Sequence, residues 1–260
     1  MPSWAPDLLG TGFDQLTLEL GEDSEGPVVA TLVRNLPHPV WARLRPLHGV
    51  DVLYVHGWSD FFFQRELAEF WTDLGARFYA LDLRKYGRSL REGQTPGYVA
   101  SLSEYDADIA AALEVIQPRP GRKLVLMGHS TGGLTLSLWA ARHPGRAQAL
   151  VLNAPWLEFQ IGSFGRQALT PLVNALAKID PLGNNPEVDF GFYTRAQRET
   201  GTLPDLPERD KWRPDRGFVT KPGWLAGVLA GHDVIAHGVN IDCPIFVIMA
   251  SESTVSLQWN

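Results

Sequence analysis

Short apolar runs alternate with longer amphipathic segments along most of this chain. Polar and apolar residues alternate over Gln15–Leu20, which predicts an edge strand, and Val28–Asn35 follows a turn-rich stretch as its hairpin partner. Val50–Val55 is mostly apolar and ends at His56-Gly57, which is typical of a strand buried on both faces. The same reasoning predicts further strands at Phe78–Leu83, Lys123–Met127, Ala149–Asn153 and Ile245–Met249.

Segments with helical spacing separate these strands. We expect helices over Phe63–Leu74, Leu102–Ile116 and Gly132–Arg142, the last of which ends before a Pro-Gly pair. Strands and helices in alternation favour an α/β fold with a mostly parallel, doubly wound sheet and helices on both faces. The opening hairpin adds an antiparallel N-terminal edge to that sheet.

The alternation stops between Trp156 and Asn240. This stretch is rich in proline, glycine and aromatic residues, and its one clear helical pattern lies near Leu169–Lys178. We interpret it as a cap, or lid, inserted above the sheet. The predicted organisation is therefore a first part of the core at 1–155, the cap at 156–240, and a continued core at 241–260 that holds the seventh strand.

Composition and charge exclude several classes of protein. Hydrophobic residues make up 45% of the chain and charged residues 20%, which is ordinary for a globular protein and argues against disorder. The net charge of -6, without a basic stripe, argues against a nucleic-acid partner. No apolar run is long enough for a membrane span, and the first residues do not resemble a signal peptide. Cys243 is the only cysteine, so no internal disulfide can form, and we expect a cytoplasmic protein.

One pentapeptide carries candidate chemistry. Gly128-His129-Ser130-Thr131-Gly132 matches G-x-S-x-G, follows a predicted buried strand and opens a predicted helix. In this strand–turn–helix setting a serine is lifted above the sheet edge as a nucleophile. Glycines on both sides relieve crowding in the sharp turn, and the helix N-terminus behind the serine favours negative charge. We therefore predict Ser130 as the catalytic nucleophile.

A serine that attacks a carbonyl also needs donors for the oxyanion that forms. The backbone N–H of Thr131, the residue after the nucleophile, is the first predicted donor. The second is expected in the loop after Val50–Val55, where Gly57 permits a close approach, and we assign it to the N–H of Trp58. We interpret the side chain of His56 as a brace of this loop rather than a base.

Four stretches together resemble the α/β-hydrolase superfamily, in particular its monoacylglycerol lipase and lysophospholipase-like branch, which is also called serine aminopeptidase-like. They are His56-Gly57-Trp58, Leu81–Ser89, Gly128–Gly133 and Asn153-Ala154-Pro155, within residues 15–155. The second departs from the D-x-R-G-x-G-x-S pattern of the family, because Lys85 stands where glycine is usual. The resemblance implies an ester or related acyl substrate, and a cap formed by Trp156–Asn240.

A serine nucleophile needs a base to take its proton and an acid to orient that base. In the family that the chain resembles, the acid follows the strand that matches Ile245–Met249. In the turn after that strand, Ser253 stands where the family usually has Asp, and the neighbouring Glu252 is the candidate acid. The competing interpretation of Glu252 is a solvated turn residue.

The base is harder to assign. The histidine of the family follows one further strand, and three histidines follow the nucleophile in these 260 residues. His143 lies at the end of the helix behind the nucleophile, while His232-Asp233 and His237 precede the seventh strand, against the family order. We therefore expect the base beyond Asn260, on a segment that completes the fold with a further strand and helix.

The apolar character of Cys243–Met249 supports this expectation, because an exposed apolar edge strand is an aggregation hazard that proteins cover. We predict that a segment carrying the acid and the histidine, contiguous or separate, packs against this strand. The gene sequence past Asn260 and the intact mass of the protein test the prediction. A stop codon directly after Asn260 in an active protein would contradict it.

Together these residues predict a serine hydrolase that cleaves a carboxylic ester with a lipid-like or otherwise apolar acyl chain through an acyl-enzyme on Ser130. Aromatic clusters near Trp58 and between Trp156 and Trp224 favour an apolar substrate pocket, or else ordinary core packing. Two alternatives use the same fold: an amide or peptide hydrolase, and a catalytically inactive protein that binds a ligand. We expect a small-molecule substrate and neither a cofactor nor a metal, since no H-E-x-x-H motif or close His/Asp cluster occurs.

Overall fold

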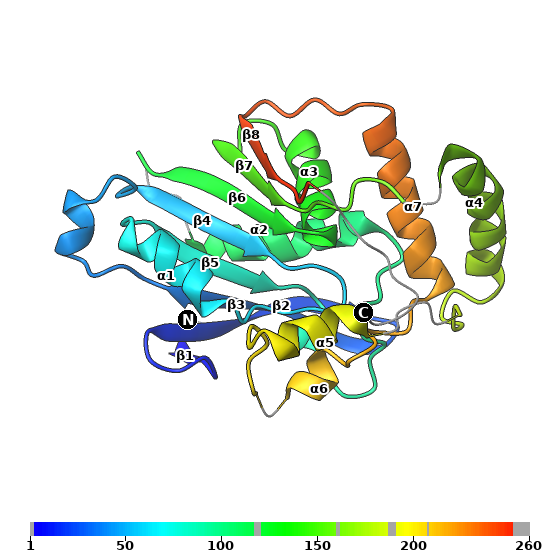
Figure 1. Cartoon of the computed structure of the whole chain (residues 1–260), viewed down its shortest axis with the longest axis horizontal. Coiled ribbons are helices and arrows are strands. Elements are labelled where there is room, and N and C mark those ends of the chain that lie inside the picture. Colours follow the sequence, from blue (N-terminus) through cyan, green and yellow to red (C-terminus); the bar gives the residue numbers. More distant parts are fainter. Residues whose placement is uncertain (1–2, 117–120, 160–161, 187–190, 207, 252–260) are drawn as a thin grey trace.

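The computed structural model describes residues 3–116, 121–159, 162–186, 191–206 and 208–251. Within these ranges the chain forms an eight-stranded sheet in the order β1-β2-β3-β5-β4-β6-β7-β8 (Figure 1). β1, β2, β3 and β5 pair antiparallel in succession, and the strands from β5 through β4 to β8 pair parallel. The strands are β1 (Ala5–Pro6), β2 (Phe13–Asp23), β3 (Gly26–Asn35), β4 (Val50–Val55), β5 (Arg77–Asp82), β6 (Lys123–His129), β7 (Ala149–Asn153) and β8 (Ile245–Ile248).

The predicted fold class is confirmed: a mostly parallel sheet carries an antiparallel N-terminal edge and helices on both faces. The predicted hairpin is β2 and β3, in which Thr17 and Thr31 are direct partners. The predicted edge strand Gln15–Leu20 lies within β2. The two-residue β1 adds outside β2 only at its start, where Ala5 pairs with Gln15, so the rest of the predicted range remains at the edge of the sheet.

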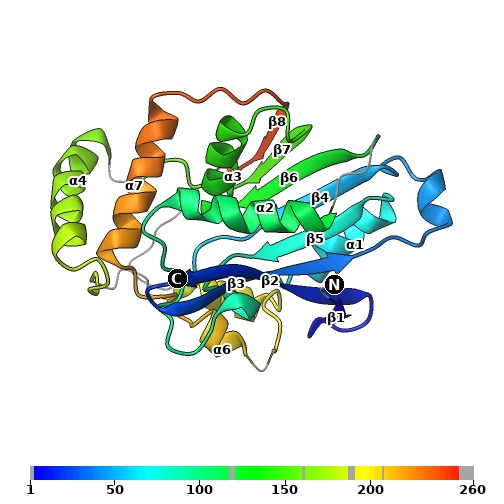
Figure 2. The same cartoon turned by 180° about the vertical axis from the view of Figure 1, so that it is seen from behind.

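Helices cover both faces of the central strands (Figures 1 and 2). Side chains of β4 alternate between two cores. Val52 and Tyr54 belong to the core under α1, whereas Leu53 and Val55 belong to the core under α2 and α3. β4 is therefore buried on both faces, as its apolar sequence predicts. The helices are α1 (Arg65–Asp73), α2 (Tyr105–Ile116) and α3 (Thr131–Arg142).

Four helices lie between β7 and β8 in the described part of the predicted cap segment. The predicted helix near Leu169–Lys178 lies within α4, but α7 was not predicted from the pattern. α7 is apolar on every side, so no amphipathic stripe marks it; it packs against both α3 and α4 beyond the carboxyl ends of the parallel strands (Figure 1). No helix of the described ranges has both the length and the apolar character needed to cross a membrane. The four are α4 (Gly162–Ile179), α5 (Phe192–Glu199), α6 (Arg209–Trp212) and α7 (Pro222–Ala236).

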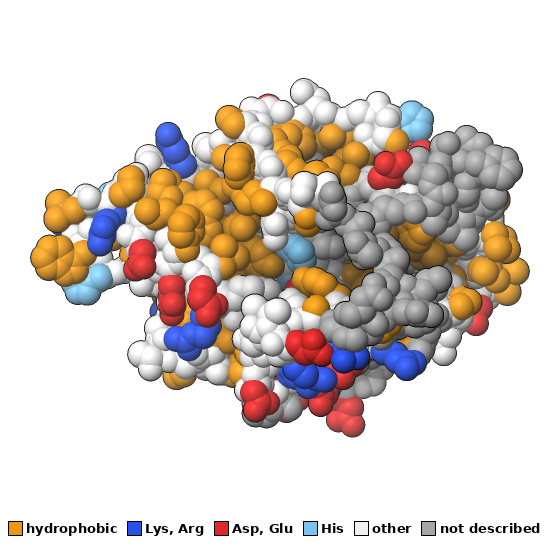
Figure 3. Space-filling view, viewed as in Figure 1, with side chains coloured by type: hydrophobic (Ala, Val, Ile, Leu, Met, Phe, Trp, Pro, Cys, Tyr) orange, Lys and Arg blue, Asp and Glu red, His pale blue; other side chains and the backbone are white. Residues whose placement is uncertain are grey.

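β8 lies at the far edge of the sheet and is apolar and exposed. The exposed fractions are 47% for Ile245, 64% for Phe246, 45% for Val247 and 44% for Ile248. Neighbouring side chains in a strand point to opposite faces, so both faces of β8 are open. Figure 3 shows hydrophobic side chains gathered over this end of the sheet. The described residues therefore leave β8 without the cover that its sequence predicts it needs.

A buried ionic cluster joins the loops that follow β4 and β5. The Asp82 carboxylate, at the end of β5, accepts hydrogen bonds from the Phe62 N–H (2.8 Å) and from the Arg88 guanidinium (2.8 Å). Arg88 also binds the buried carboxylate of Asp7, at 2.6 Å. Because charged groups away from water are stable only when paired and hydrogen-bonded, this cluster fixes both loops relative to the sheet.

Lys85, which replaces the usual glycine of the family pattern, has a left-handed backbone with φ of 62°. This conformation disfavours a side chain, and the glycine preference of the family has the same physical origin. Here the buried Lys85 ammonium forms ion pairs with Asp23 (2.6 Å) and Glu25 (2.5 Å) of the β2–β3 hairpin. Burial alone would raise the pKa of both carboxyls, but the hydrogen bonds from Lys85 hold each pKa below its ordinary value.

We expect Arg88→Met to lower the free energy of unfolding by about 3–5 kcal/mol, because it leaves two buried carboxylates without their cation. Urea denaturation followed by tryptophan fluorescence measures the change. The control is Arg195→Met, which breaks the exposed pair between Arg195 and Glu199 and should cost less than about 1 kcal/mol. Equal losses in the two variants would show that the cluster does not hold the loops.

Candidate active site

Ser130 lies at a sharp turn between β6 and α3. Its φ is 51° and its ψ is -119°, a combination that residues with a side chain rarely adopt. Hydrogen bonds hold this conformation: the Ser130 N–H donates to the Asn153 carbonyl (3.1 Å), and the Ser130 carbonyl accepts from the N–H groups of Gly133 and Trp156 (both 3.0 Å). The turn is thus held by the chain after β7 as well as by α3.

The glycines of this turn are required by close packing. A Cβ atom on Gly132 would lie 2.3 Å from the His56 carbonyl oxygen, and one on Gly128 would lie 2.7 Å from the Gly132 carbonyl oxygen. The turn therefore packs directly against the end of β4. The same packing brings the loop after β4 beside the serine, since a Cβ on Gly57 would lie 3.1 Å from the Ser130 Cβ.

The two predicted oxyanion donors lie on either side of this contact. Thr131 is the first residue of α3, where N–H groups have no partner within the helix. Trp58 directly follows Gly57, which lies against Ser130. Among the described residues, neither N–H group donates to another backbone carbonyl. The geometry is compatible with both donor roles, which stay predictions.

His56 is engaged through both ring nitrogens. Its Nδ1 lies 2.8 Å from the Gly57 carbonyl oxygen, and its Nε2 accepts a hydrogen bond from the Leu83 N–H (3.1 Å). Burial lowers the pKa of His56, which favours the neutral ring that this pair of bonds requires. The side chain therefore ties the loop after β4 to the loop after β5, and neither nitrogen faces Ser130.

Ser130 lines a cavity of about 280 Å³ whose wall includes a buried ion pair. Asp60 comes from the loop after β4 and Arg213 from the residue after α6, and the Arg213 Nε lies 3.2 Å from the Asp60 Oδ1. Burial raises the pKa of Asp60 to about 7, although the Arg213 charge opposes the shift. The sequence analysis missed both residues. Asp60 lies close to Trp58 in the sequence, but no local pattern points to Arg213 as its partner.

His129, the residue before the serine, also lines this cavity and was not considered from the sequence. Its Nδ1 lies 3.2 Å from both the carbonyl oxygen and the side-chain nitrogen of Asn153, at the end of β7. Burial lowers the pKa of His129, and the Arg213 charge lowers it further. The contacts with Asn153 orient the ring, while burial and the Arg213 charge favour its neutral form.

A second cavity, of about 590 Å³, adjoins the first and is predominantly apolar. The two share Trp58, Trp156 and Gly217, so they lie side by side, with Ser130 in the wall of the smaller one. The aromatic residues singled out from the sequence are thus partly a cavity lining. The other apolar residues of this wall are Phe159, Leu172, Val173, Leu176, Pro186, Phe218, Val219, Trp224 and Leu225.

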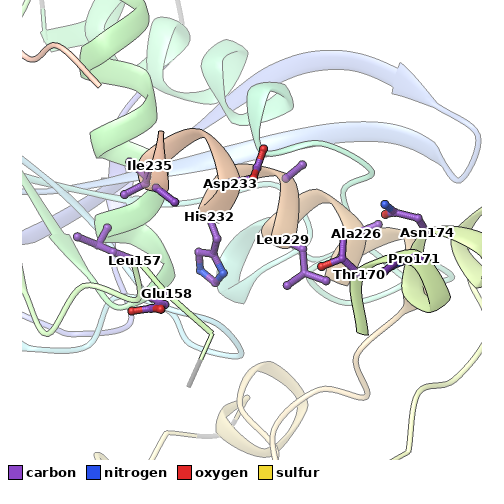
Figure 4. A pocket seen from close by; sticks show the side chains of 12 residues that line it. Leu157, Glu158, Thr170, Pro171, Asn174, Ala226, Leu229, His232, Asp233 and Ile235 are labelled. Atoms are coloured by element: carbon purple, nitrogen blue, oxygen red, sulfur yellow. The ribbon is translucent and has the colours of Figure 1, made fainter. Parts of the chain in front are cut away.

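His232 lies in α7, in a different cavity. Its Nε2 is 2.9 Å from the Trp156 carbonyl oxygen, and its ring meets the Trp156 ring edge-on. In Figure 4 His232 points from α7 toward Glu158, while Asp233 leaves the helix in another direction. Asp233 instead lies 3.5 Å from His237, and both of these side chains are exposed. The structure therefore does not bring His232-Asp233 together as a catalytic pair.

The remaining candidates do not complete the site. His143 is bound through Nδ1 to the Trp139 carbonyl oxygen (2.8 Å) at the far end of α3. None of the histidines in the described ranges hydrogen-bonds to the Ser130 hydroxyl. The candidate acid Glu252 and its neighbour Ser253 lie outside the described residues. A search of the described side chains finds no cluster of three or more His, Cys, Asp or Glu suited to a metal ion.

The chain is similar in sequence to known proteins. Residues 50–257 match the family model described as serine aminopeptidase, S33. Monoacylglycerol lipase of Mycolicibacterium smegmatis is 27% identical over 187 residues, which cover 65% of this chain and 63% of the relative. Lysophospholipase L2 of Escherichia coli is 39% identical over 93 residues, which cover 35% of this chain and 27% of the relative. The chain thus spans less than two thirds of the length of these curated relatives.

A solved structure shows the same fold. A soluble variant of monoglyceride lipase from Saccharomyces cerevisiae, in complex with a substrate analog, superposes with a TM-score of 0.65 at 14% identity. The superposition covers 95% of this chain and 79% of the yeast chain. At this level of identity the likeness concerns the arrangement of helices and strands.

We expect Gly132→Ala to lower the free energy of unfolding by about 3 kcal/mol, because the new methyl group would overlap two backbone carbonyls at the end of β4. Gly21→Ala is the matched control: φ at Gly21 is +87° and nothing lies within 4 Å of the added atom, so only the backbone cost of about 1 kcal/mol applies. Urea denaturation of both variants measures the difference. Equal costs would mean that the turn can move away from β4.

Proposed function

Because the chain belongs to the serine aminopeptidase S33 family of α/β hydrolases, we propose that it is a serine hydrolase that cleaves a carboxylic ester through an acyl-enzyme on Ser130. The observation that carries the proposal is the position of Ser130. It lies on a strained turn held by hydrogen bonds, it packs against the loop after β4, and it lines a cavity. Strain of this kind is maintained where the surrounding structure requires a defined side-chain position.

In the proposed reaction the Ser130 hydroxyl oxygen attacks the ester carbonyl carbon and gives its proton to a base. The carbonyl oxygen becomes an oxyanion that accepts hydrogen bonds from the N–H groups of Trp58 and Thr131. The alcohol leaves with a proton, and the acyl group remains on Ser130. Water then attacks the acyl-enzyme, which releases a carboxylic acid and restores the serine.

The N-terminus of α3 supports the oxyanion. The aligned peptide dipoles of a helix place partial positive charge at its first turn, which begins at Thr131. Burial lowers the pKa of His56 and of His129, so neither ring adds a charge beside the serine. Pre-oriented donors in a water-poor site stabilise such an oxyanion more strongly than donors in water.

The apolar cavity favours a substrate with an apolar acyl chain. It is walled by the aromatic side chains of Trp58, Trp156 and Trp224, and the centroids of the Trp58 and Trp224 rings lie 3.7 Å apart. In this assignment residues 156–240 form a cap over the site. The hydrogen bond from the Phe218 N–H to the Ser59 hydroxyl (2.9 Å) ties this cap to the loop after β4.

The proposed reaction also needs a catalytic base, and an acid to orient that base. None of the described histidines hydrogen-bonds to the Ser130 hydroxyl, and β8 exposes apolar side chains on both faces. We therefore expect the base on a polypeptide segment that covers β8, as the sequence pattern predicts. A segment in that position would lie beside the carboxyl ends of β7 and β8, close to the turn that holds Ser130.

We expect a fluorophosphonate probe to label the protein stoichiometrically at Ser130 when the complete gene is expressed. Ser130→Ala should abolish labelling, whereas Ser103→Ala, which removes an exposed hydroxyl far from the turn, should leave it unchanged. Intact-mass spectrometry and peptide mapping give the readout. Esters with apolar acyl chains should be hydrolysed only by protein that labels.

The outcomes separate the rival functions. Labelling with hydrolysis of amides but not esters would make the protein an amide or peptide hydrolase with the same nucleophile. Absence of labelling in folded, complete protein would contradict the proposal and favour a catalytically inactive fold that binds a ligand. The folded state in each case is checked by the urea denaturation described for the other variants.

A further inference from the structure

The polar part of the Ser130 cavity contains a buried arginine. Arg213 follows α6 directly, and its side chain is only 5% exposed. It lines the same cavity as Ser130. Its charge also acts on His129: burial lowers the pKa of His129, and the charge of Arg213 lowers it further. Arg213 is therefore within electrostatic range of the position where an ester would react.

The hydrogen bonds of Arg213 are incomplete. Its Nη2 donates to the side-chain oxygen of Gln197, and its Nε lies 3.2 Å from the Asp60 carboxylate. Its Nη1 is buried and has no hydrogen-bond partner in the part of the chain that the structure describes. An unpaired buried donor costs free energy, and such atoms are rare in folded proteins. Because Arg213 lines the cavity, a small shift of its guanidinium would bring this donor to a ligand oxygen there.

The two adjoining cavities divide a substrate by polarity. The apolar cavity of about 590 Å³ suits the acyl chain, and the cavity of about 280 Å³ with Arg213 is left for the alcohol part. Both meet at Trp58 and Trp156, next to the serine. An ester bond placed at Ser130 would therefore have its apolar end on one side and Arg213 on the other.

On the basis of the proposed ester hydrolysis at Ser130, we propose that the alcohol part of the substrate carries an anionic oxygen group, a phosphate or a carboxylate, which Arg213 binds. A guanidinium binds such groups with charge-assisted hydrogen bonds, which are stronger than neutral ones. The Arg213 Cζ lies over the rings of Phe63 and Tyr193, 5.8 and 5.6 Å from their centroids, which is within the range of a cation–π interaction.

Asp60 competes with the ligand for Arg213. Burial raises the pKa of Asp60 to about 7, so the carboxyl is largely neutral below that pH and charged above it. The other titratable groups around Asp60 are Arg213, Asp82, Tyr54 and Tyr193. Burial raises the pKa of both tyrosines above the ordinary value, so neither ionises near pH 7. Affinity for an anion should therefore fall as the pH rises through about 7.

Three ether ligands without a scissile ester test the proposal: octyl glyceryl ether, its methyl phosphodiester and its carboxymethyl ether. Calorimetric titration should show that at least one anionic ether binds about tenfold or more tightly than the neutral ether. The anion with the higher affinity identifies phosphate or carboxylate as the group. Arg213→Gln should abolish the preference for the anionic ether over the neutral one, and Arg213→Lys should retain part of it.

Three further variants separate recognition from general damage. Asp60→Asn should increase the preference for the anion and remove its dependence on pH between about 6 and 8, an effect that a merely structural role would not produce. Leu225→Trp, in the wall of the apolar cavity, should weaken all three ethers by a similar factor. Arg198→Gln, at an exposed arginine that pairs with Asp215, should change none of them.

Equal affinity of the unaltered protein for neutral and anionic ethers would overturn the proposal, as would a preference that survives in Arg213→Gln. Neither result depends on the reactivity of Ser130, because the ethers are not hydrolysed. Equal affinities combined with normal fluorophosphonate labelling would exclude an anionic alcohol part and still support the proposal of a serine hydrolase. Failure of labelling would exclude the proposed serine hydrolase. The titrations alone would then decide whether Arg213 binds an anionic group.

Discussion

The contact between the turn at Ser130 and the end of β4 is the constraint on which the candidate site depends. Gly132 lies so close to the carbonyls of Val55 and His56 that no side chain fits there. This approach forces the chain to reverse within one residue, and Ser130 adopts a left-handed φ as a result. The hydrogen bonds from Gly133 and Trp156 to the Ser130 carbonyl maintain the strained conformation. The position of the Ser130 Cβ, from which the hydroxyl projects, therefore follows from backbone packing.

The loops around Ser130 are held by buried polar groups rather than by secondary structure. Asp82 and Arg88 connect the loop after β4 with the loop after β5, and His56 bonds across the same gap to Leu83. Both loops lie at the carboxyl ends of parallel strands, which is where α/β sheets place their ligand sites. Lys85 adds a tie to the β2–β3 hairpin that the usual glycine could not make. Charge pairing in a buried setting thus supplies rigidity where hydrogen bonds between strands end.

The segment between β7 and β8 gives the site its chemical asymmetry. α4 and α7 contribute an apolar wall, whereas the stretch after α6 contributes Arg213. A cavity with one apolar and one charged side favours substrates that are themselves amphiphilic, because each part loses less free energy on leaving water when it meets a matching surface. In the proposed reaction, the strained serine and the divided cavity would together restrict both where the ester is attacked and how it is oriented.

The local pattern of the sequence determined the central strands, the helices α1 to α3 and the position of Ser130. These features depend on residues that are neighbours along the chain: period-two and helical spacing for the elements, and flanking glycines for the turn. The open faces of β8 were also foreseeable, since its apolar residues follow one another directly. Tertiary structure alone decided that β1 pairs with the start of β2 and that α7, apolar on every side, packs between α3 and α4. It alone paired Asp60 with Arg213 and set them beside Ser130, because two charges far apart in sequence leave no periodic signal and meet only after the sheet and the inserted helices have packed.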